Sequence, residues 1–426
     1  MNFQEKWRKL LLPLRYGGSG VDFKKLDPAR SPFLQDRDRI IYSSSFRRLA
    51  RKTQVHPLVR NDHIHTRLSH SLEVSSVGRS LGAMAGYFLR RRDELPEYAA
   101  PEFPGQILEA ACLAHDIGNP PFGHAGEFAI RDWFGDPTNH TYVNALEETH
   151  QSDFRCFDGN AQGFRVVNVV ENNRDQGGFR LTYPTLASMV KYPWDSWQSR
   201  TRSGKCKFNY YQAEAGIFEE VFCALGLKTR RGDFARHPLS LLAEAADDTC
   251  YRIVDMEDAR ELDIITLADI LKVVEPLAPS LKLDPQRLED MGSDRERAGY
   301  VRARVIGHVT ASLFETFAAQ YERIMRREFE GPLMDMAPED VRAYMDRAKE
   351  IFNGRILTRR RWRSGPTVST SACWIPSSRP AIAASAIPGG SPTRSSRPCS
   401  SWAAMRRAVR MTCTSPICGC WISSPA

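Results

Sequence analysis

Residues 107–127, ILEAACLAHDIGNPPFGHAGE, constrain the fold more strongly than any other stretch of the chain. Apolar residues recur there at helical spacing and lead into His115 and Asp116, which predicts a buried helix that ends in an imidazole and a carboxylate. A metal ion is one of the few partners that suits both groups, because an unpaired buried charge is costly. We expect Gly118 to take the left-handed conformation that ends a helix, and the two prolines after it to prevent its resumption.

The rest of the body also favours helices. Residues 66–84 and 238–271 place apolar side chains at helical spacing, and residues 280–355 alternate helical runs with polar breaks. Residues 136–162 are polar and irregular, and residues 173–210, rich in Gly, Pro and aromatic residues, predict an ordered loop with a short helix. Since we find no internal repeat and few alternating β-type runs, the predicted fold class is all-α.

The net charge of +8 is concentrated in the last part of the chain. Residues 351–426 contain 11 Arg, no Lys and no acidic residue, which leaves 48 basic and 51 acidic residues in the body. The charge of the body therefore does not indicate a nucleic-acid partner. The tail, residues 358–426, is rich in Ser, Pro and Arg but also holds Trp and Cys, so we interpret it as the product of a reading-frame shift. A one-nucleotide shift of a GC-rich back-translation yields helix-like stretches such as AAVEERAHRVDERL.

The N-terminal segment lacks the apolar core of a signal peptide, and no stretch approaches the ~18 apolar residues that span a bilayer. We therefore expect a soluble cytoplasmic protein that does not enter membranes. The body cysteines show no CxxC spacing and lie in apolar runs, which is typical of reduced structural thiols. They are Cys112, Cys156, Cys206, Cys223 and Cys250.

His70, His115, Asp116 and a later aspartate can offer two imidazole nitrogens and two carboxylates to one ion. This mixture suits Mn²⁺, Fe²⁺, Co²⁺, Ni²⁺ or Zn²⁺ better than Mg²⁺, which prefers oxygen ligands. Such a site leaves positions for water and for a phosphate oxygen, and so favours hydrolysis near neutral pH. Taken alone, an HD dipeptide is a weak signal, and His70 also fits a hydrogen-bonded core or capping histidine.

Six stretches in order make the signal specific. They are FRRLARKTQV (46–55), HTRLSHSLEV (65–74), LAHDIGNPPFGHAGE (113–127), GNAQGFR (159–165), LTYPTLASMVKYP (181–193) and EAADDTCYRIVDMEDA (244–259). Over residues 30–355 the chain resembles the HD-domain phosphohydrolase superfamily, and within it the bacterial dGTPase-like deoxynucleoside triphosphate triphosphohydrolases. We therefore expect an N-terminal basic helical segment (1–60), a helical HD-domain catalytic core (61–275) and a C-terminal helical region (276–357).

The resemblance implies a role for each matching residue. It assigns the metal to His70, His115, Asp116 and Asp247, with Asp247 preferred to Asp248 because it precedes a tyrosine by four residues. His124 is implied as the catalytic histidine, and Glu127 as its orienting partner. Their spacing of three independently predicts one helical face, although a solvated first-turn glutamate is the alternative. The implied substrate residues are Gln54 and Val55 near base and sugar, Tyr251 and Asp255 at the sugar, Arg67, Asn119 and Lys191 at the phosphates, and Tyr192 beside Lys191.

The implied reaction converts a dNTP, with dGTP favoured, to the deoxynucleoside and triphosphate through attack at the α-phosphorus. Mn²⁺ is the favoured ion. The resemblance also implies a homo-oligomer, a hexamer or tetramer, with a dNTP or single-stranded DNA as effector. Two alternatives stay open: another HD-type nucleotide phosphodiesterase with extra ligands such as His140 and His150, and a non-catalytic nucleic-acid-binding protein that uses Arg47, Arg48 and Arg51.

Overall fold

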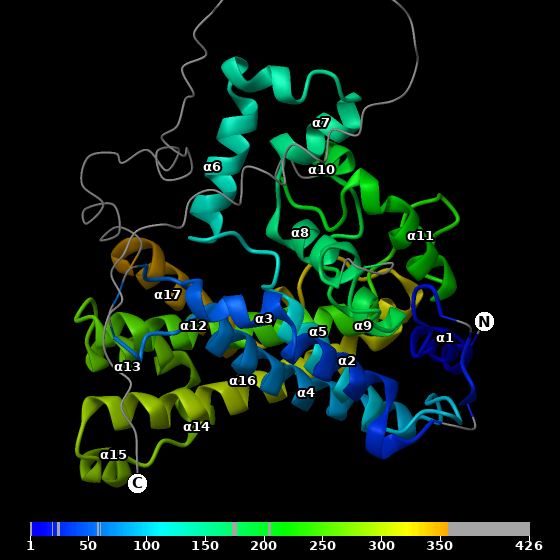
Figure 1. The fold of residues 1–426 in the computed structure, drawn as a ribbon. Coiled ribbons are helices and arrows are strands. Elements are labelled where there is room, and N and C mark those ends of the chain that lie inside the picture. The colour runs from blue at the N-terminus through cyan, green and yellow to red at the C-terminus, as the bar shows by residue number, and fades with distance from the viewer. Residues whose placement is uncertain are drawn as a thin grey trace, which may run out of the picture. The chain divides into compact units, whose positions relative to one another are not determined.

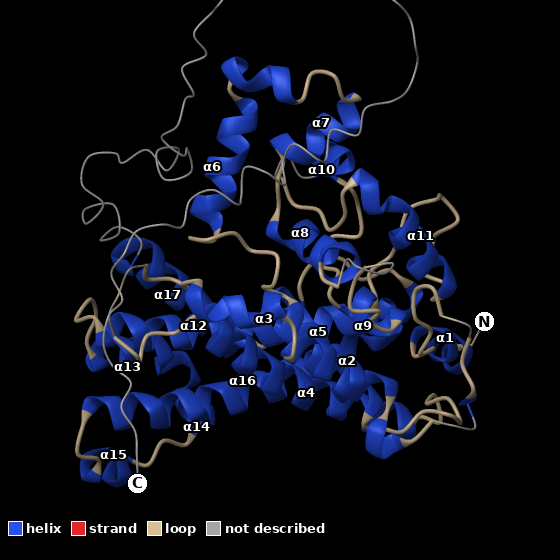
Figure 2. Ribbon diagram, in the orientation of Figure 1, coloured by secondary structure: helices blue, strands red, loops and turns tan. Residues whose placement is uncertain are grey.

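The computed structural model describes residues 2–18, 20–23, 26–57, 59, 61–172, 177–202 and 206–356. The tail at 358–426, and with it the hypothesis of a reading-frame shift, lies outside the described residues. Within them the prediction of an all-α fold is confirmed, because β-structure is limited to isolated bridges such as Arg15 with Thr182. Figure 2 shows helices joined by loops and turns throughout this part.

The α-helices are numbered as in Figure 1. They are α1 (Phe3–Leu10), α2 (Pro32–Ile41), α3 (Ser44–Arg48), α4 (Arg67–Arg91), α5 (Phe103–Ala114), α6 (His124–Gly135), α7 (Glu148–Arg155), α8 (Gly159–Arg165), α9 (Tyr183–Ser188), α10 (Ser196–Arg202), α11 (Ala215–Ala224), α12 (Pro238–Glu261), α13 (Leu267–Val274), α14 (Ala278–Leu281), α15 (Pro285–Asp290), α16 (Asp294–Arg326) and α17 (Glu339–Ile351). Short π-helical turns cover Val166–Val170 and Phe352–Ile356.

Helices α4, α5 and α12 pack against one another, and α16 covers α12 (Figure 1). A stripe of glycines lets α4 approach α5 closely. A Cβ on Gly78 would lie 2.6 Å from Cys112 Sγ, one on Gly82 would lie 2.4 Å from the Pro104 carbonyl, and one on Gly86 would lie 1.8 Å from the Pro101 carbonyl. Because none of these separations accommodates a side chain, glycine at these positions sets the spacing of the two helices.

The hydrophobic core is continuous from Trp7 in α1 to Ile356 after α17. Trp7 is fully buried, and its indole Nε1 donates a 2.7 Å hydrogen bond to the Tyr321 hydroxyl on α16. Buried indole groups need such a partner, so this bond fixes how the first helix packs. The domain boundaries expected at residues 60 and 275 remain predictions. Segments on both sides of each boundary contribute to this one core.

The prediction of one helix over 238–271 is wrong at its end. Helix α12 stops at Glu261, Asp263 adopts a left-handed φ of 54°, and α13 starts afresh at Leu267. Thr266 and Asp269 form a capping box that satisfies the free amides of the new helix. The region 136–162, predicted to be irregular, contains α7 and the first residues of α8.

Gly118 does not take the left-handed conformation that we predicted. The positive φ angles of this loop belong to Phe122 (66°) and Gly123 (55°), just before α6. Gly118 is required for a different reason: a Cβ there would lie 2.0 Å from the amide nitrogen of Gly163 and 2.3 Å from the Gly159 carbonyl. The absent side chain therefore allows the end of α5 to lie directly against α8.

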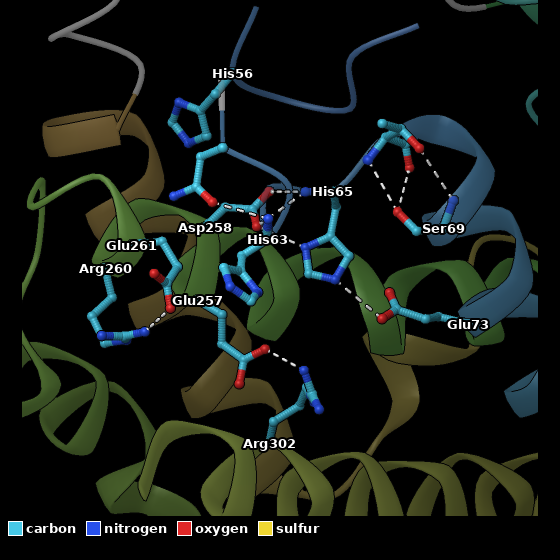
Figure 3. Close-up of polar contacts among 12 residues, drawn as sticks. His56, His63, His65, Ser69, Glu73, Glu257, Asp258, Arg260, Glu261 and Arg302 are labelled. Atoms are coloured by element: carbon cyan, nitrogen blue, oxygen red, sulfur yellow. Dashed lines mark hydrogen bonds and ion pairs between the residues drawn. The ribbon is translucent and has the colours of Figure 1, made fainter. Parts of the chain in front are cut away.

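His65 ties the start of α4 to the end of α12 (Figure 3). Its Nδ1 lies 2.7 Å from Asp258 Oδ1 and its Nε2 lies 3.1 Å from Glu73 Oε1, while its backbone amide also donates to Asp258. Burial alone would lower the pKa of His65, but the hydrogen bonds with Asp258 and Glu73 raise it to about 10. His65 is therefore an imidazolium at neutral pH, and it joins two helices that both carry predicted site residues.

Within the part of the chain that the structure describes, none of the helices combines the length and apolar character that crossing a membrane requires.

Candidate active site

One cavity of about 990 Å³ gathers nearly all of the predicted site residues. Its lining comes from the loops before α4 and after α5, from helices α4, α6, α8 and α12, from the segments around residues 191 and 207, and from the turn after α17. The predicted residues that line it are Gln54, Val55, Arg67, His70, His115, Asp116, Asn119, His124, Glu127, Lys191, Tyr192, Asp247 and Tyr251. Asp255 is the one predicted residue that does not line it.

His70, His115 and Asp247 form a cluster in which one potential ligand atom of each lies within 4.8 Å of the others. Asp247 Oδ1 is 3.0 Å from His70 Nε2 and 3.7 Å from His115 Nε2. The Nδ1 of His115 lies 2.6 Å from the Cys112 carbonyl, so it carries the proton and Nε2 keeps its lone pair. Burial would raise the pKa of Asp247, but the hydrogen bond with His70 lowers it below its ordinary value.

This donor set fits a divalent transition-metal ion. Two neutral imidazole nitrogens and one carboxylate oxygen converge, and the second ring nitrogen of His70, Nδ1, is buried without a hydrogen-bond partner. Mixed nitrogen and oxygen ligation is typical of Mn²⁺, Fe²⁺, Co²⁺, Ni²⁺ and Zn²⁺. Among the described residues this is the one His, Cys, Asp and Glu cluster with that geometry.

Asp116 lies beside the cluster but outside its group of three. Its Oδ2 is 3.6 Å from His115 Nε2 and accepts a 2.6 Å hydrogen bond from Arg67 Nη1, while its Oδ1 accepts from the Asn119 side chain. A buried carboxylate needs such partners, and the Arg67 guanidinium counteracts burial and lowers the pKa of Asp116. Arg67 and Asn119, both predicted to bind phosphate, therefore orient a predicted metal ligand in this structure.

His124 and Glu127 lie on one face of the first turn of α6. His124 Nδ1 is 2.8 Å from Glu127 Oε2, and the imidazole is 75% exposed to the cavity while the carboxylate is 3% exposed. Burial would raise the pKa of Glu127, but the hydrogen bond with His124 and the nearby Lys207 lower it to about 2. An ionised carboxylate on Nδ1 fixes the tautomer and presents Nε2 to the cavity.

Glu127 is itself held by two other segments. Its Oε1 accepts a 2.8 Å hydrogen bond from the Gly159 amide at the start of α8, and its Oε2 lies 3.6 Å from Arg131 and 3.8 Å from Lys207. Lys207 Nζ also lies 3.0 Å from Asp158, which is fully buried. Three backbone segments thus converge on the carboxylate that orients His124.

Lys191 reaches the cavity from the segment after α9. Its Nζ lies 2.7 Å from Glu244 Oε1, and Arg236 lies 2.8 Å from the other oxygen of the same carboxylate. The Glu244 charge overcomes the effect of burial and raises the pKa of Lys191. The side-chain oxygen of Asn209 accepts from the backbone amides of both Lys191 and Tyr192, which fixes this pair at the cavity wall.

Tyr251 and Asp255 lie on successive turns of α12. The Tyr251 ring packs 5.5 Å from Phe352 and 4.7 Å from the Arg252 guanidinium. Asp255 is 1% exposed, and neither of its carboxylate oxygens has a hydrogen-bond partner. Burial, reinforced by the neighbouring Asp258, raises the pKa of Asp255 well above its ordinary value.

Comparison with known proteins gives a consistent result. The HD domain family model matches residues 67–178, which include His70, His115 and His124. A deoxyguanosinetriphosphate triphosphohydrolase-like protein of Pseudomonas aeruginosa is 41% identical over 358 residues, which cover 83% of this chain and 80% of the relative.

The chain belongs to the deoxyguanosinetriphosphate triphosphohydrolase-like family of HD-domain hydrolases. A protein of the same description from Synechocystis is 40% identical over 346 residues, 78% of this chain and 76% of the relative. The deoxyguanosinetriphosphate triphosphohydrolase of Klebsiella pneumoniae is 37% identical over 266 residues, 55% of this chain and 51% of the relative. Asp247, which joins the histidine cluster, lies outside the segment that the HD domain model matches.

Several cavity residues of this family member had not been assigned from the sequence. Lys207 and Asn160 reach the cavity beside Glu127, and Phe352 and Asn353 close it from the turn after α17. Asn160 lies in a stretch that carried the resemblance, whereas the others carry no local signal. The structure does not bring His140 or His150 to the metal cluster, since His140 contacts the Gly135 carbonyl and His150 lies near Glu147.

Proposed function

We propose that the chain hydrolyses deoxynucleoside triphosphates, with dGTP favoured, to the deoxynucleoside and triphosphate. The observation that carries the proposal is that the His124–Glu127 pair opens into the same cavity as the His70, His115 and Asp247 cluster. A proton-transfer group and a metal site that face one space suit hydrolysis of a phosphate ester. The names of the relatives support the same substrate class.

His70, His115 and Asp247 would hold the ion, with Asp116 adjacent, and Mn²⁺ is the favoured metal. When bound, a divalent ion neutralises phosphate charge and lowers the pKa of water. The chain supplies the remaining chemistry. His124, held at Nδ1 by Glu127, exchanges a proton at Nε2 with the attacking water or with the 5′-oxygen that leaves the α-phosphorus.

The cationic side of the cavity suits the triphosphate. Lys191 is paired with Glu244, and Arg67 is paired with Asp116. These ion pairs hold both cations in fixed positions at the cavity wall. Phosphoryl reactions depend mainly on positioning and on electrostatic stabilisation, which preorganised cations provide. Asn119 and Tyr192 complete the proposed phosphate side.

The part of the cavity around Tyr251 and Phe352 suits the nucleoside. Tyr251 packs on Phe352 and lines the cavity, so its ring is the proposed wall that would exclude a 2′-hydroxyl from the sugar. Asp255, one turn further along α12 and just outside the cavity lining, remains the predicted acceptor for the 3′-hydroxyl, because its two buried oxygens have no hydrogen-bond partner. Gln54 and Val55 would lie near the base and sugar.

The deciding experiment incubates the purified full-length chain with dGTP and Mn²⁺ in H₂¹⁸O and identifies the products by mass spectrometry. The proposal predicts deoxyguanosine and triphosphate, with ¹⁸O in the triphosphate because water attacks phosphorus. Pyrophosphate as product would instead indicate another HD-type phosphodiesterase. Absence of any product from a metal-loaded chain would contradict the proposal and favour a binding protein.

His124→Ala is expected to abolish turnover while the bound metal remains, because His124 is not part of the metal cluster. Retained turnover would remove His124 from the mechanism. The hexamer or tetramer, and the dNTP or single-stranded DNA effector, remain predictions that size measurements and titrations of effector against activity would test.

A further inference from the structure

Cys156 and Cys206 are in contact although fifty residues separate them along the chain. Their Sγ atoms lie 2.7 Å apart, within hydrogen-bonding distance. Cys156 follows α7 and is 5% exposed, whereas Cys206 is half-buried and therefore reachable by a small solute. The sequence predicted separate structural thiols, and a contact between the segments after α7 and after α10 carries no sequence signal.

The two thiols differ in reactivity. The hydrogen bond between them lowers the pKa of Cys206 to about 6, and the guanidinium groups of Arg131 and Arg200 act in the same direction. The same hydrogen bond, together with burial, raises the pKa of Cys156. The two shifts run in opposite directions, so Cys206 is the more acidic thiol of the pair and the better nucleophile. An accessible low-pKa cysteine beside a second cysteine is the arrangement that redox-sensitive sites use.

This pair adjoins the residues that hold Glu127. Arg131 on α6 donates from Nε to the Phe157 carbonyl at 2.7 Å and from Nη2 to the Cys206 carbonyl at 3.2 Å. Cys156 is followed within three residues by the Gly159 amide that donates to Glu127, and Cys206 is followed at once by Lys207. Each cysteine thus begins one of the two segments that contact the Glu127 carboxylate.

We propose that Cys156 and Cys206 are a redox-active pair that a hydroperoxide oxidises to a disulfide, which links the two segments that hold Glu127. The Cys206 thiolate donates an electron pair to one peroxide oxygen, the O–O bond breaks, and the departing hydroxide leaves as water after taking a proton. The Cys156 sulfur then attacks the sulfenic sulfur of Cys206, the S–O bond breaks, and the thiol proton leaves with a second water. Two thiols and one hydrogen peroxide therefore give one disulfide and two waters.

The test exposes the full-length chain to hydrogen peroxide, blocks the remaining thiols with iodoacetamide, and maps tryptic peptides without reduction. We expect a linked pair of peptides that contain Cys156 and Cys206, and we expect it to disappear after treatment with dithiothreitol. In short exposures to iodoacetamide at pH 7 without peroxide, Cys206 should react roughly tenfold faster than Cys223, an exposed cysteine outside the pair.

Three variants make the test specific. Cys156→Ser should leave Cys206 oxidised to higher acids or bound to other thiols, Cys206→Ser should prevent the link, and the matched control Cys223→Ser should leave the link unchanged. Circular dichroism of each variant verifies folding. The proposal is overturned if wild-type chain forms the 156–206 link no more often than links that include Cys223, or if Cys206 reacts no faster than Cys223. Because the readout is covalent, it is independent of whether dNTP is the substrate.

Discussion

His124 and Glu127 share a 2.8 Å hydrogen bond, yet the imidazole is 75% exposed and the carboxylate is 3% exposed. The proposed proton-transfer group thus faces the cavity, while the carboxylate that would orient it is enclosed by α8 and by the segment around residue 207. Burial of the orienting carboxylate restricts the imidazole to one tautomer and one direction. This division between an exposed reactive group and an enclosed orienting group motivates the first prediction.

Glu127→Gln should lower kcat for dNTP hydrolysis by about 10²-fold, because the amide cannot stabilise a charged imidazole as a carboxylate does. Metal content, measured by elemental analysis after dialysis, should not change. Glu148→Gln, the same replacement on an exposed helix surface, serves as the control and should leave kcat unaltered. Equal kcat in Glu127→Gln and wild type would show that Glu127 does not act through His124.

Asp247 and its neighbour Asp248 both face the cavity, but only Asp247 lies at the histidines. Asp247→Asn should weaken binding of Mn²⁺ by about 10- to 100-fold, because an amide oxygen replaces a charged ligand. Asp248→Asn should retain the metal, since burial raises the pKa of Asp248 to about 7 and makes it a poorer anion. Calorimetric titration of each purified variant with Mn²⁺ measures the two affinities. An equal loss of Mn²⁺ affinity in both variants would reject the preference for Asp247.

His65 should make stability depend on pH in a defined direction. Its folded-state pKa of about 10 lies above its ordinary value, so the pairs with Asp258 and Glu73 stabilise the fold fully below about pH 6.5 and lose this effect as the pH rises through about 10. His65→Gln should lower the free energy of unfolding by about 3 kcal/mol at pH 6 and by much less at pH 10.5. Urea unfolding of both chains at the two pH values measures this, and a deficit that is constant with pH would mean that folded His65 is neutral.

Gly86→Ala should destabilise the fold by at least about 2 kcal/mol, because the new methyl group would overlap the Pro101 carbonyl. Gly307→Ala is the matched control, since this glycine lies within α16 with nothing near its missing Cβ, and should stabilise by about 0.5–1 kcal/mol. Thermal unfolding followed by circular dichroism compares them. The two variants should shift the melting temperature in opposite directions, and shifts in the same direction would contradict the close approach of α4 to the segment just before α5.

Tyr251→Ala should reduce the preference for dGTP over GTP by about tenfold, because the proposed wall against a 2′-hydroxyl would be removed. Tyr251→Phe keeps the ring and should retain the preference. The ratio of kcat/KM for the two nucleotides is the measurement. An unchanged ratio in Tyr251→Ala would place the sugar elsewhere in the cavity.

The site was predictable where chemistry and local spacing coincide. Helical spacing placed His124 and Glu127 together, and the end of the apolar run located His115 and Asp116 at the end of α5. Thr66, predicted to begin a helix, caps α4 with a side-chain hydrogen bond to Ser69. In each case the relevant partners lie within a few residues, so the local pattern contains the information.

The remainder depends on contacts between distant segments. Gly118 was predicted to be a helix terminator, but the approach of α8, which no local pattern reveals, explains the missing side chain. The break at Asp263 could have been inferred from the capping box at Thr266, which the long apolar pattern obscured. Lys207 reaches Glu127 through a contact between segments far apart in the sequence, and a single sequence does not contain that geometry.

Phe352 and Asn353 form the last wall of a cavity whose first wall is Gln54, so the pocket is assembled from nearly the whole described length. This has a consequence for biosynthesis. About three hundred residues after Gln54 must be synthesised before Phe352 can complete the cavity wall. A nascent chain that already carries every histidine of the site therefore still lacks part of the proposed nucleoside-binding wall. Competence to bind substrate should therefore arise abruptly, near the end of translation of the body.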